Sequence, residues 1–455
     1  AGEERDAEEP GPRTAAERAT DRDGSAPLFR FDREETRRDR LAASAERAAG
    51  PWPLAGRLWA ESRDSERLRT LLIAAGLGDR ALRSVEGDTL GAALEGSRVL
   101  AVPLGEAVLR GGAEGTHEEL AGSYRGVGEG GAAGPVVATL DGRRRRAAAF
   151  LTGDWTVPLA ADLRLRLVGG TRWDRIDDRV ATAGTAPGPA DADDAVQDAW
   201  SPRLGANLLL DRPGRPPLAL WLRAARAFKA PTLEQLFDPR PLPDFAGGTI
   251  TLANPDLSPQ RAADLELGAR GATTAGPLLW EIAAYRTEVD DEIDFDPATF
   301  RYANIGATRH EGFEAEARLG RPDRLATTAA WTWQRVVPRE GANAGRQLKN
   351  IPEHSARLTT TAALPADLAL TATLSWLGNR WLDDAHRFPL GEATVIDLRL
   401  VAQRPWGELR LDLLNVAGEE HDELGLALPD FTGGEVPYCF PAPGRAAKLE
   451  LAWDF

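Results

Sequence analysis

Strict alternation of apolar and polar residues over about a dozen positions is the feature that most limits how this chain can fold. The segment 162–174 reads DLRLRLVGGTRWD, in which every second residue is Leu, Gly, Thr or Trp and most of the others are Arg or Asp. The pattern returns in the segments 312–319, 367–376, 395–402, 408–413 and 448–455. Successive side chains of a strand point to opposite faces, so the pattern predicts strands with one apolar and one charged face.

The length of these strands favours a membrane barrel over a soluble β-sandwich, which is the alternative. Strands in soluble sheets average about five or six residues, whereas about ten are needed for a tilted strand to cross a bilayer. In such a barrel the lumen tolerates charge, which explains how a chain with 27% charged residues could lie in a membrane. Tryptophans at strand ends, such as Trp155, Trp173 and Trp453, fit interfacial aromatic girdles. We therefore predict an all-β fold, a large antiparallel transmembrane β-barrel of the outer-membrane type.

Short and long connections alternate along the chain. Short turns such as 211–215 and 403–407 alternate with long connections such as 229–260 and 417–445. Outer-membrane barrels have short periplasmic turns and long external loops, so this parity places the long connections outside. We count roughly 17 strands at ~10 residues each plus loops. Residues 1–25 are charged and turn-rich, and we expect a flexible segment or external loop there, with the barrel over residues 26–455.

Charge and motif content exclude several functions. A net charge of −15 argues against nucleic-acid binding, which needs a concentrated basic face. The five histidines form no HExxH motif and no GxSxG motif occurs, so we predict no enzyme activity. Cys439 has no partner in the chain and is either a small buried residue or a link to another chain. The basic run Arg143 to Arg146 could bind lipopolysaccharide phosphates or an anionic chelate, or be a solvated strand end.

Two acidic clusters in expected loops are weak candidates for metal binding. Calcium prefers about six to eight oxygen ligands, which loops rich in carboxylates can supply. The candidates are Asp191, Asp193, Asp194, Asp290 and Asp291. The alternative is a charged loop that keeps the rim soluble, and we predict no other cofactor.

Several strings of the chain, in their order and spacing, resemble the C-terminal β-barrel of TonB-dependent outer-membrane receptors. They begin with RAFKAPTLEQLF at 226–237 and NPDLSPQR at 254–261 and continue with YANIG at 302–306, EGFEAE at 311–316, NIPEH at 350–354 and LDLLNV at 411–416. The resemblance runs from about Leu28 to the end and is densest from Arg143 onward. It implies a location in the outer membrane of a diderm bacterium, among outer-membrane lipid and lipopolysaccharide.

The resemblance also implies a function and its partners. Receptors of this family take up a scarce solute, such as a ferric siderophore, cobalamin or another chelate, without covalent chemistry. Ligand capture uses loop aromatics and arginines, which makes Arg240, Phe245 and Tyr302 the candidates here, although Phe245 could instead pack on a neighbouring loop. The terminal Phe455 would be the signal read by the barrel-assembly machinery.

The sequence departs from the family pattern because parts that such receptors have are not seen in it. We see no N-terminal plug and no segment that engages TonB, and about five strands of the usual 22 are absent. We expect that these parts were lost by truncation or lie on a separate chain, so that TonB acts only through a plug that this chain lacks. The alternatives to a receptor are a plug-less scaffold subunit of an envelope assembly and a passive pore.

Overall fold

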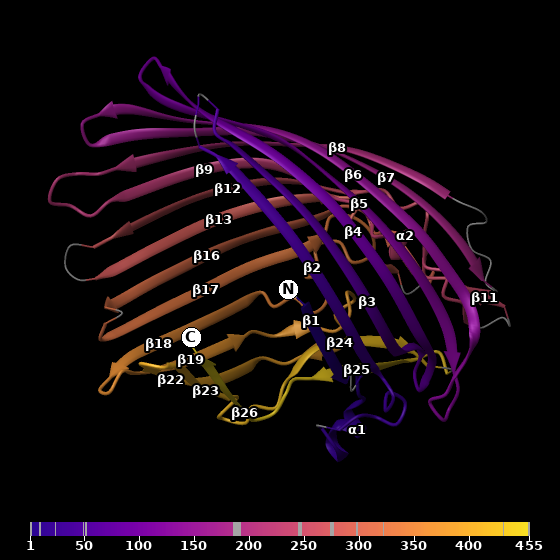
Figure 1. Ribbon diagram of the computed structural model, residues 1–455. Coiled ribbons are helices and arrows are strands. Elements are labelled where there is room, and N and C mark those ends of the chain that lie inside the picture. Colours follow the sequence, from indigo (N-terminus) through magenta and orange to yellow (C-terminus); the bar gives the residue numbers. More distant parts are fainter. Residues whose placement is uncertain are drawn as a thin grey trace.

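One antiparallel sheet of 18 strands makes up most of the chain, and it curves round into a barrel-like wall (Figure 1). The structure is a computed structural model that describes residues 2–8, 11–22, 24–48, 50, 52–184, 193–243, 248–273, 277–296, 299–321, 323–430 and 432–453. Each strand pairs with the next one of the sheet in chain order, from β1 to β26. The predicted all-β, antiparallel barrel fold is confirmed, and the observed 18 strands lie close to the expected number of about 17.

The wall strands β2 to β8 are 15 to 28 residues long, whereas β1 and the wall strands from β9 onward have 7 to 14 residues. Those of the first half are β1 (Gly2–Glu8), β2 (Arg33–Arg47), β3 (Leu54–Ala74), β4 (Leu77–Val102), β5 (Gly105–Val127), β6 (Ala133–Ala160), β7 (Leu163–Gly184), β8 (Asp193–Leu210) and β9 (Leu218–Lys229). Those of the second half are β12 (Gln260–Ala272), β13 (Leu278–Asp290), β16 (Thr308–Arg321), β17 (Leu325–Pro338), β18 (His354–Leu364), β19 (Leu368–Leu377), β22 (Ala393–Arg404), β23 (Gly407–Leu414) and β26 (Ala446–Trp453).

The remaining elements lie in the connections between wall strands. Four small hairpins occur among the described residues, and they pair β10 (Leu242–Pro243) with β11 (Thr249–Ile250), β14 (Ile293–Asp296) with β15 (Arg301–Asn304), β20 (Arg380–Trp381) with β21 (Pro389–Leu390), and β24 (Asp422–Pro429) with β25 (Glu435–Pro441). The part of the chain that the structure describes also contains two helices, α1 (Ala15–Thr20) and α2 (Leu233–Phe237). All of them lie at one end of the wall, which we call the long-loop end, and the opposite end is the short-turn end. No helix among the described residues is long and apolar enough to span a bilayer.

Directly paired residues of neighbouring strands share a face of the sheet, so the register assigns an inner and an outer face around the whole wall. On β12, Glu266 faces inward beside Arg223 of β9 and Tyr285 of β13. Leu267, the next residue, faces outward beside Leu222, and their side chains are 56% and 51% exposed. The alternation in the sequence therefore separates a charged lumen from an apolar outer face.

Two strands form the edges of the sheet. Among the residues that the structure describes, β1 pairs only with β2 and β26 only with β23. At the long-loop end, the β24–β25 hairpin contacts the first part of the chain. The backbones of Arg13 and Cys439 exchange hydrogen bonds of 2.7 and 2.8 Å, and the hydroxyl of Tyr438 accepts one of 2.8 Å from the Gly76 N–H. This hairpin thus fastens the two halves of the sheet to each other.

The N-terminal segment is partly ordered into elements. Residues 1–25 were expected to be flexible or external, and in the structure Gly2–Glu8 is strand β1 and Ala15–Thr20 is helix α1. The side-chain oxygen of Thr14 accepts a 3.3 Å hydrogen bond from the Glu17 N–H and caps α1. A domain boundary at residue 26 stays a prediction.

Candidate functional site

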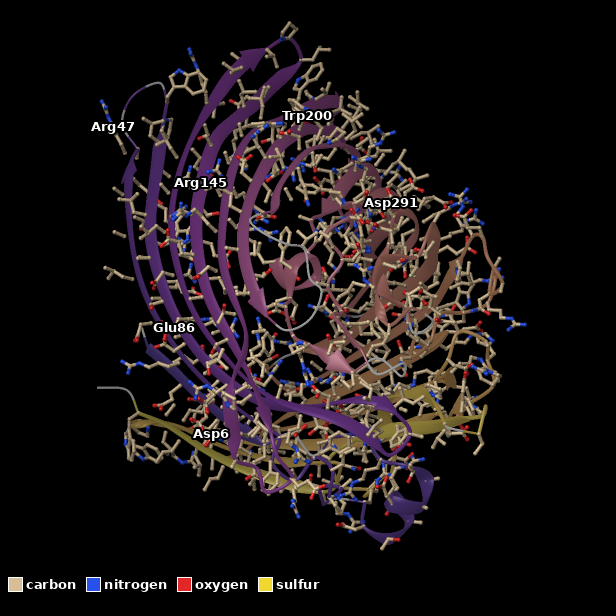
Figure 2. The ribbon with its side chains drawn as sticks, turned by 90° about the vertical axis from the view of Figure 1, so that its right-hand side faces the viewer. Asp6, Arg47, Glu86, Arg145, Trp200 and Asp291 are labelled. Carbon is tan, nitrogen blue, oxygen red and sulfur yellow. The ribbon has the colours of Figure 1, made fainter. Side chains whose placement is uncertain are left out.

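The connection between β9 and β12 folds back into the barrel, where Figure 2 shows its helix within the ring of strands. We call residues 230–243 and 248–259 the inner loop. Its helix α2 begins at Thr232, whose side chain accepts a 3.1 Å hydrogen bond from the Gln235 N–H, while Gln235 Oε1 accepts one from the Thr232 N–H. The capping box lets this short helix form at a defined place in the loop.

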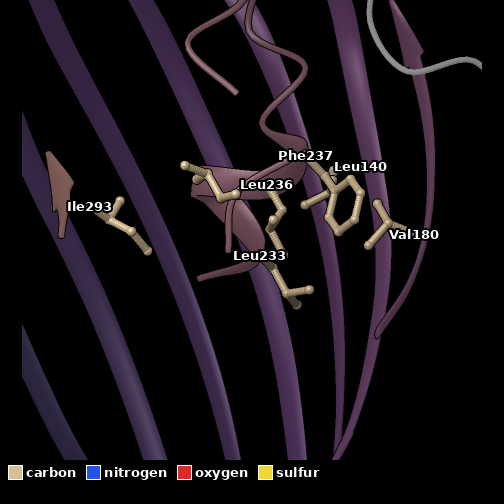
Figure 3. Close-up of a cluster of buried hydrophobic side chains, with 7 residues drawn as sticks. Leu140, Val180, Leu233, Leu236, Phe237 and Ile293 are labelled. Atoms are coloured by element: carbon tan, nitrogen blue, oxygen red, sulfur yellow. The ribbon is translucent and has the colours of Figure 1, made fainter. Parts of the chain in front are cut away.

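The apolar side of α2 docks on the inner wall of the barrel. Leu233, Leu236 and Phe237 are buried against Leu140 of β6 and Val180 of β7 (Figure 3). These two wall residues interrupt a luminal face that is otherwise rich in charge. The interruption gives the inner loop an apolar surface on which to pack.

A buried ion pair fixes the start of the inner loop. Arg144 of β6 binds Asp178 of β7 through two hydrogen bonds of 2.7 Å, and the Asp178 side chain is fully buried. The same guanidinium donates a 2.9 Å hydrogen bond to the carbonyl of Pro231. Arg144, one member of the basic run, therefore holds the loop, whereas its neighbours Arg143 and Arg145 fall on the outer face.

Two further polar contacts hold the end of α2. The Tyr124 hydroxyl donates a 2.9 Å hydrogen bond to Asp238, and burial raises the pKa of the Asp238 carboxyl above its ordinary value. Arg240 binds Asp79 at 2.7 Å and donates a 2.9 Å hydrogen bond to the backbone carbonyl of the same residue. The inner loop is therefore attached to β4, β5, β6 and β7 at once.

A polar hollow of about 350 Å³ lies on the luminal wall beside α2. Three arginines and four glutamates are among its lining residues, which are Arg63, Arg67, Arg83, Glu34, Glu61, Glu118 and Glu234. Arg67 is paired with Glu34 at 2.6 Å and Arg83 with Glu234 at 2.5 Å. Glu61 is paired with Arg38 at 3.2 Å, whereas neither Arg63 nor Glu118 forms an ion pair with another of the described residues. The hollow therefore presents one cationic and one anionic side chain to the lumen. The hollow has the size and the polar groups to hold part of a charged small molecule, and Arg63 is the side chain that could contact an anionic group of it.

Four of the other long loops are joined to one another in a rim. Lys349 forms ion pairs with Asp294 at 2.8 Å and with Asp384 at 3.3 Å, and so joins three loops. Burial alone would lower the pKa of Lys349, but the two carboxylates raise it above its ordinary value. The side chain of Asn350 joins the fourth loop by exchanging hydrogen bonds of 2.9 and 3.0 Å with the backbone of Gly425.

Two of the predicted ligand-binding residues lie next to the inner loop. Arg240 is part of its attachment to Asp79, and Tyr302 is half-buried and packs against the apolar cluster around α2. The backbone N–H of Tyr302 also donates a 3.0 Å hydrogen bond to Leu252 in the inner loop. Both side chains therefore support the loop, and Phe245 lies outside the described residues.

The predicted metal candidates are spread over two places. Asp191 lies outside the described residues, and Asp193 and Asp194 begin β8 with side chains that the structure does not describe. Asp290 ends β13 opposite Arg261, and the carbonyl of Asp291 accepts a 2.7 Å hydrogen bond from Asn304. No group of three metal-binding side chains occurs in the described part of the chain. Loop calcium therefore stays a prediction.

Two residues near the C-terminus were also singled out in the sequence, Cys439 and Phe455. Cys439 is buried, as in one of the two interpretations considered for it, and burial raises the pKa of its thiol to about 11. Phe455 lies outside the described residues, and its role in assembly stays a prediction.

The sequence interpretation missed the residues that hold the inner loop. Asp79, Tyr124 and Asp178 look like ordinary luminal residues when the strands are considered singly. Only the register, which places Arg144 beside Asp178, brings them to the same part of the wall.

Comparison with known proteins identifies the family. A family model described as "TonB dependent receptor-like, beta-barrel" matches residues 6–416. Among solved structures, the unliganded ferric citrate transporter FecA superposes with a TM-score of 0.73 at 14% identity, over 98% of this chain and 65% of that one. The ferric yersiniabactin uptake receptor FyuA from Yersinia pestis gives 0.67 at 13% identity, over 92% and 61%, and the siderophore receptor PiuA from Acinetobacter baumannii gives 0.70 at 16%, over 92% and 64%.

These similarities in structure concern the fold, and the chain spans less than two thirds of the length of these three receptors. The family is one of outer-membrane receptors and transporters. The family match covers most of the sequence, and the 18-stranded sheet agrees with it. This chain, which consists of a β-barrel wall and its long loops, belongs to the TonB-dependent receptor family.

Proposed function

We propose that this chain is the barrel of an outer-membrane receptor that takes up a scarce solute as a chelate, such as a ferric siderophore or cobalamin. The observation that carries the proposal is the inner loop, which is held over a luminal hollow where Arg63 forms no ion pair with any residue that the structure describes. A docked loop and a charged hollow together offer a small anionic ligand both a cover and a binding surface. The ligands named for FecA and FyuA, ferric citrate and ferric yersiniabactin, are ferric chelates.

The apolar outer face supports a place in the outer membrane of a diderm bacterium. Outward residues such as Leu204 and Leu267 are 70% and 56% exposed, and a lipid environment would remove that surface from water. The long-loop end would then face outside and the short-turn end the periplasm. Assembly there would involve the barrel-assembly machinery.

Energised uptake requires parts beyond this barrel. We infer that the barrel supplies the wall and the external vestibule, while a plug in the lumen supplies the gate and the contact with TonB. Arg240 and Tyr302 then belong to the part of the vestibule closest to the ligand, and Phe245 remains a proposed ligand-binding residue. Arg240 would contact the ligand only after release from Asp79, so ligand binding and movement of the inner loop are coupled.

The test is ligand binding by the purified chain in detergent. Ferric citrate, a ferric catecholate and cyanocobalamin are titrated by calorimetry, and the Arg63→Gln variant should bind any anionic ligand about tenfold more weakly because one charge-assisted contact is lost. Arg166→Gln is the matched control, since Arg166 is also luminal but pairs with Asp154 away from the hollow. Equal weakening by both variants would contradict the role of the hollow. Steady conductance of the chain in a planar bilayer, together with no binding, would instead indicate a passive pore.

A further inference from the structure

A groove of about 880 Å³ crosses the outer face of β2 to β6. Its sides are formed by Leu41, Leu58 and Leu90, which are 76%, 63% and 60% exposed, so no other part of the described chain covers them. Gly115 has no side chain and leaves the groove open between these leucines and β6. We call this feature the outer-wall groove.

The outer-wall groove lies where the outer face changes from apolar to charged. One row of directly paired residues runs across the five strands, through Leu41, Ala60, Leu90, His117 and Arg145. The next outward residues toward the short-turn end are all apolar: Ala43, Leu58, Ala92, Gly115 and Ala147. Those toward the long-loop end are all polar: Asp39, Ser62, Asp88, Glu119 and Arg143. In a membrane barrel such a change marks the level of the lipid headgroups.

A cation without a partner lies at one end of this groove. The Arg145 side chain is exposed, and none of the described residues forms an ion pair or a hydrogen bond with its guanidinium. Its two cross-strand neighbours are His117 and Asp177, and the carboxylate of Asp177 is already engaged by Arg175 at 3.2 Å. Glu119, the nearest carboxylate on β5, is likewise engaged by His117 at 3.2 Å and Arg143 at 3.1 Å. The charge of Arg145 is therefore not compensated within the described chain.

An apolar groove with a cation at the headgroup level matches an amphiphile that carries a phosphate. Arginine binds phosphate through two parallel N–H donors, and this pairing is strongest where water is partly excluded. An acyl chain buried in the groove would add a further apolar contribution in proportion to the surface that it covers. A soluble anion would gain nothing from the leucines, and a purely apolar lipid would gain nothing from Arg145.

We propose that the outer-wall groove binds one lipopolysaccharide molecule of the surrounding leaflet, with an acyl chain between Leu58 and Leu90 and a phosphate on Arg145. The proposal rests on the outer-membrane placement given above. It adds a specific lipid site on the wall of the barrel, separate from the luminal hollow. The lipid would stay with the protein when the bulk membrane is removed by detergent.

The first test measures lipid retention by native mass spectrometry of the full chain in a non-ionic detergent, with Kdo2-lipid A as the probe. Arg145→Gln should weaken binding about tenfold, since one charge-assisted contact is lost. Arg261→Gln is the matched control, because Arg261 is also exposed and outward at the long-loop end, but on β12. Equal retention by the two variants would overturn the proposal.

The second test fills the groove without changing a charge. A Cβ at Gly115 would have the Arg146 carbonyl oxygen as its nearest neighbour at 3.7 Å, so Gly115→Leu fits the backbone and occupies the groove. Gly153→Leu is the control, because Gly153 is outward on β6 with nothing within 4 Å of a Cβ there. Gly115→Leu should lower retention of Kdo2-lipid A at least fivefold and Gly153→Leu should not.

Competition separates the lipid from a free anion. Inorganic phosphate at millimolar concentration should not displace Kdo2-lipid A, and complete displacement would overturn the role of the groove. If the wild-type chain retains Kdo2-lipid A but binds none of the chelates, the transport proposal alone is refuted. If the purified protein stays monodisperse in buffer without detergent, the outer-membrane placement is refuted, and the lipid site with it.

Discussion

Replacing Asp178 with alanine should release the inner loop from the barrel wall. In the docked state the substitution leaves the Arg144 guanidinium under the loop without its carboxylate partner, whereas in the undocked state water in the lumen solvates it. Removing one partner of a buried ion pair costs about 3–5 kcal/mol, which corresponds to roughly a hundredfold to several-thousandfold shift toward the undocked loop. Hydrogen exchange of the peptide over residues 230–243 should accelerate by that factor.

A double variant distinguishes the ion pair from a general loss of stability. Arg144→Met with Asp178→Leu removes both charges and leaves only the lost hydrogen bond to Pro231, so its effect should fall to about 1 kcal/mol. Asp154→Ala is the control on the same two strands, because the ion pair of Asp154 with Arg166 is exposed and contributes at most about 1 kcal/mol. A double variant as damaging as Asp178→Ala would refute the argument that the unpaired charge releases the loop.

Three further predictions concern the wall, the rim and one turn. Leu267→Arg on the lipid-facing side should lower the free energy of unfolding in vesicles by about 2–4 kcal/mol. Ala283→Arg on the luminal side should change it little, and equal losses in the two variants would contradict the assignment of faces. The pKa of Lys349 is raised, so its contribution to the rim is present below its ordinary value of 10.5 and lost as the pH rises through the folded value. The protection factor of residues 339–353, which is the intrinsic exchange rate divided by the observed one and so corrects for the intrinsic rise of exchange with pH, should thus fall in the wild type only at alkaline pH, and Lys349→Met should abolish this fall. Gly407→Ala should lower the free energy of unfolding in urea by about 1–3 kcal/mol, because φ is +140° at this position and a Cβ would collide with the carbonyl of Ala452. An unchanged midpoint of the urea transition would contradict this.

The sequence predicted the fold well because the outer face of a membrane barrel must stay apolar along each membrane-spanning strand. The alternation in β7, β12 and β26 is a direct result of this requirement. Where a strand extends beyond the apolar band, its outward side chains become charged and the alternation disappears. Outward Glu86 and Asp88 of β4 show this change, and β1, with the sequence GEERDAE, has no apolar alternation at all.

The candidate site was less accessible to sequence reasoning, because its contacts join residues that are far apart in the chain. Arg240 and Tyr302 were singled out as loop residues that could bind a ligand, and the structure shows them attached to the inner loop and its surroundings. Nothing near Arg240 in the sequence indicates that Asp79 is its partner. The apolar docking surface of Leu140 and Val180 was equally hidden, since two apolar residues on a luminal face do not alter the overall pattern.

The contact between the β24–β25 hairpin and the N-terminal segment has a consequence for the order of folding. Arg18 binds Asp422, 404 residues further along the chain. Closing a loop of that length costs about 5 kcal/mol of chain entropy, and the ion pair and the few hydrogen bonds of this contact, at about 1 kcal/mol each, do little more than offset that cost. The contact therefore becomes stable only after the intervening strands have brought the two ends close. The contact between the β24–β25 hairpin and the N-terminal segment should therefore be among the last contacts to form. Under mechanical load it should also be among the first to break, so that the two edges of the sheet would separate there before neighbouring strands of the wall do.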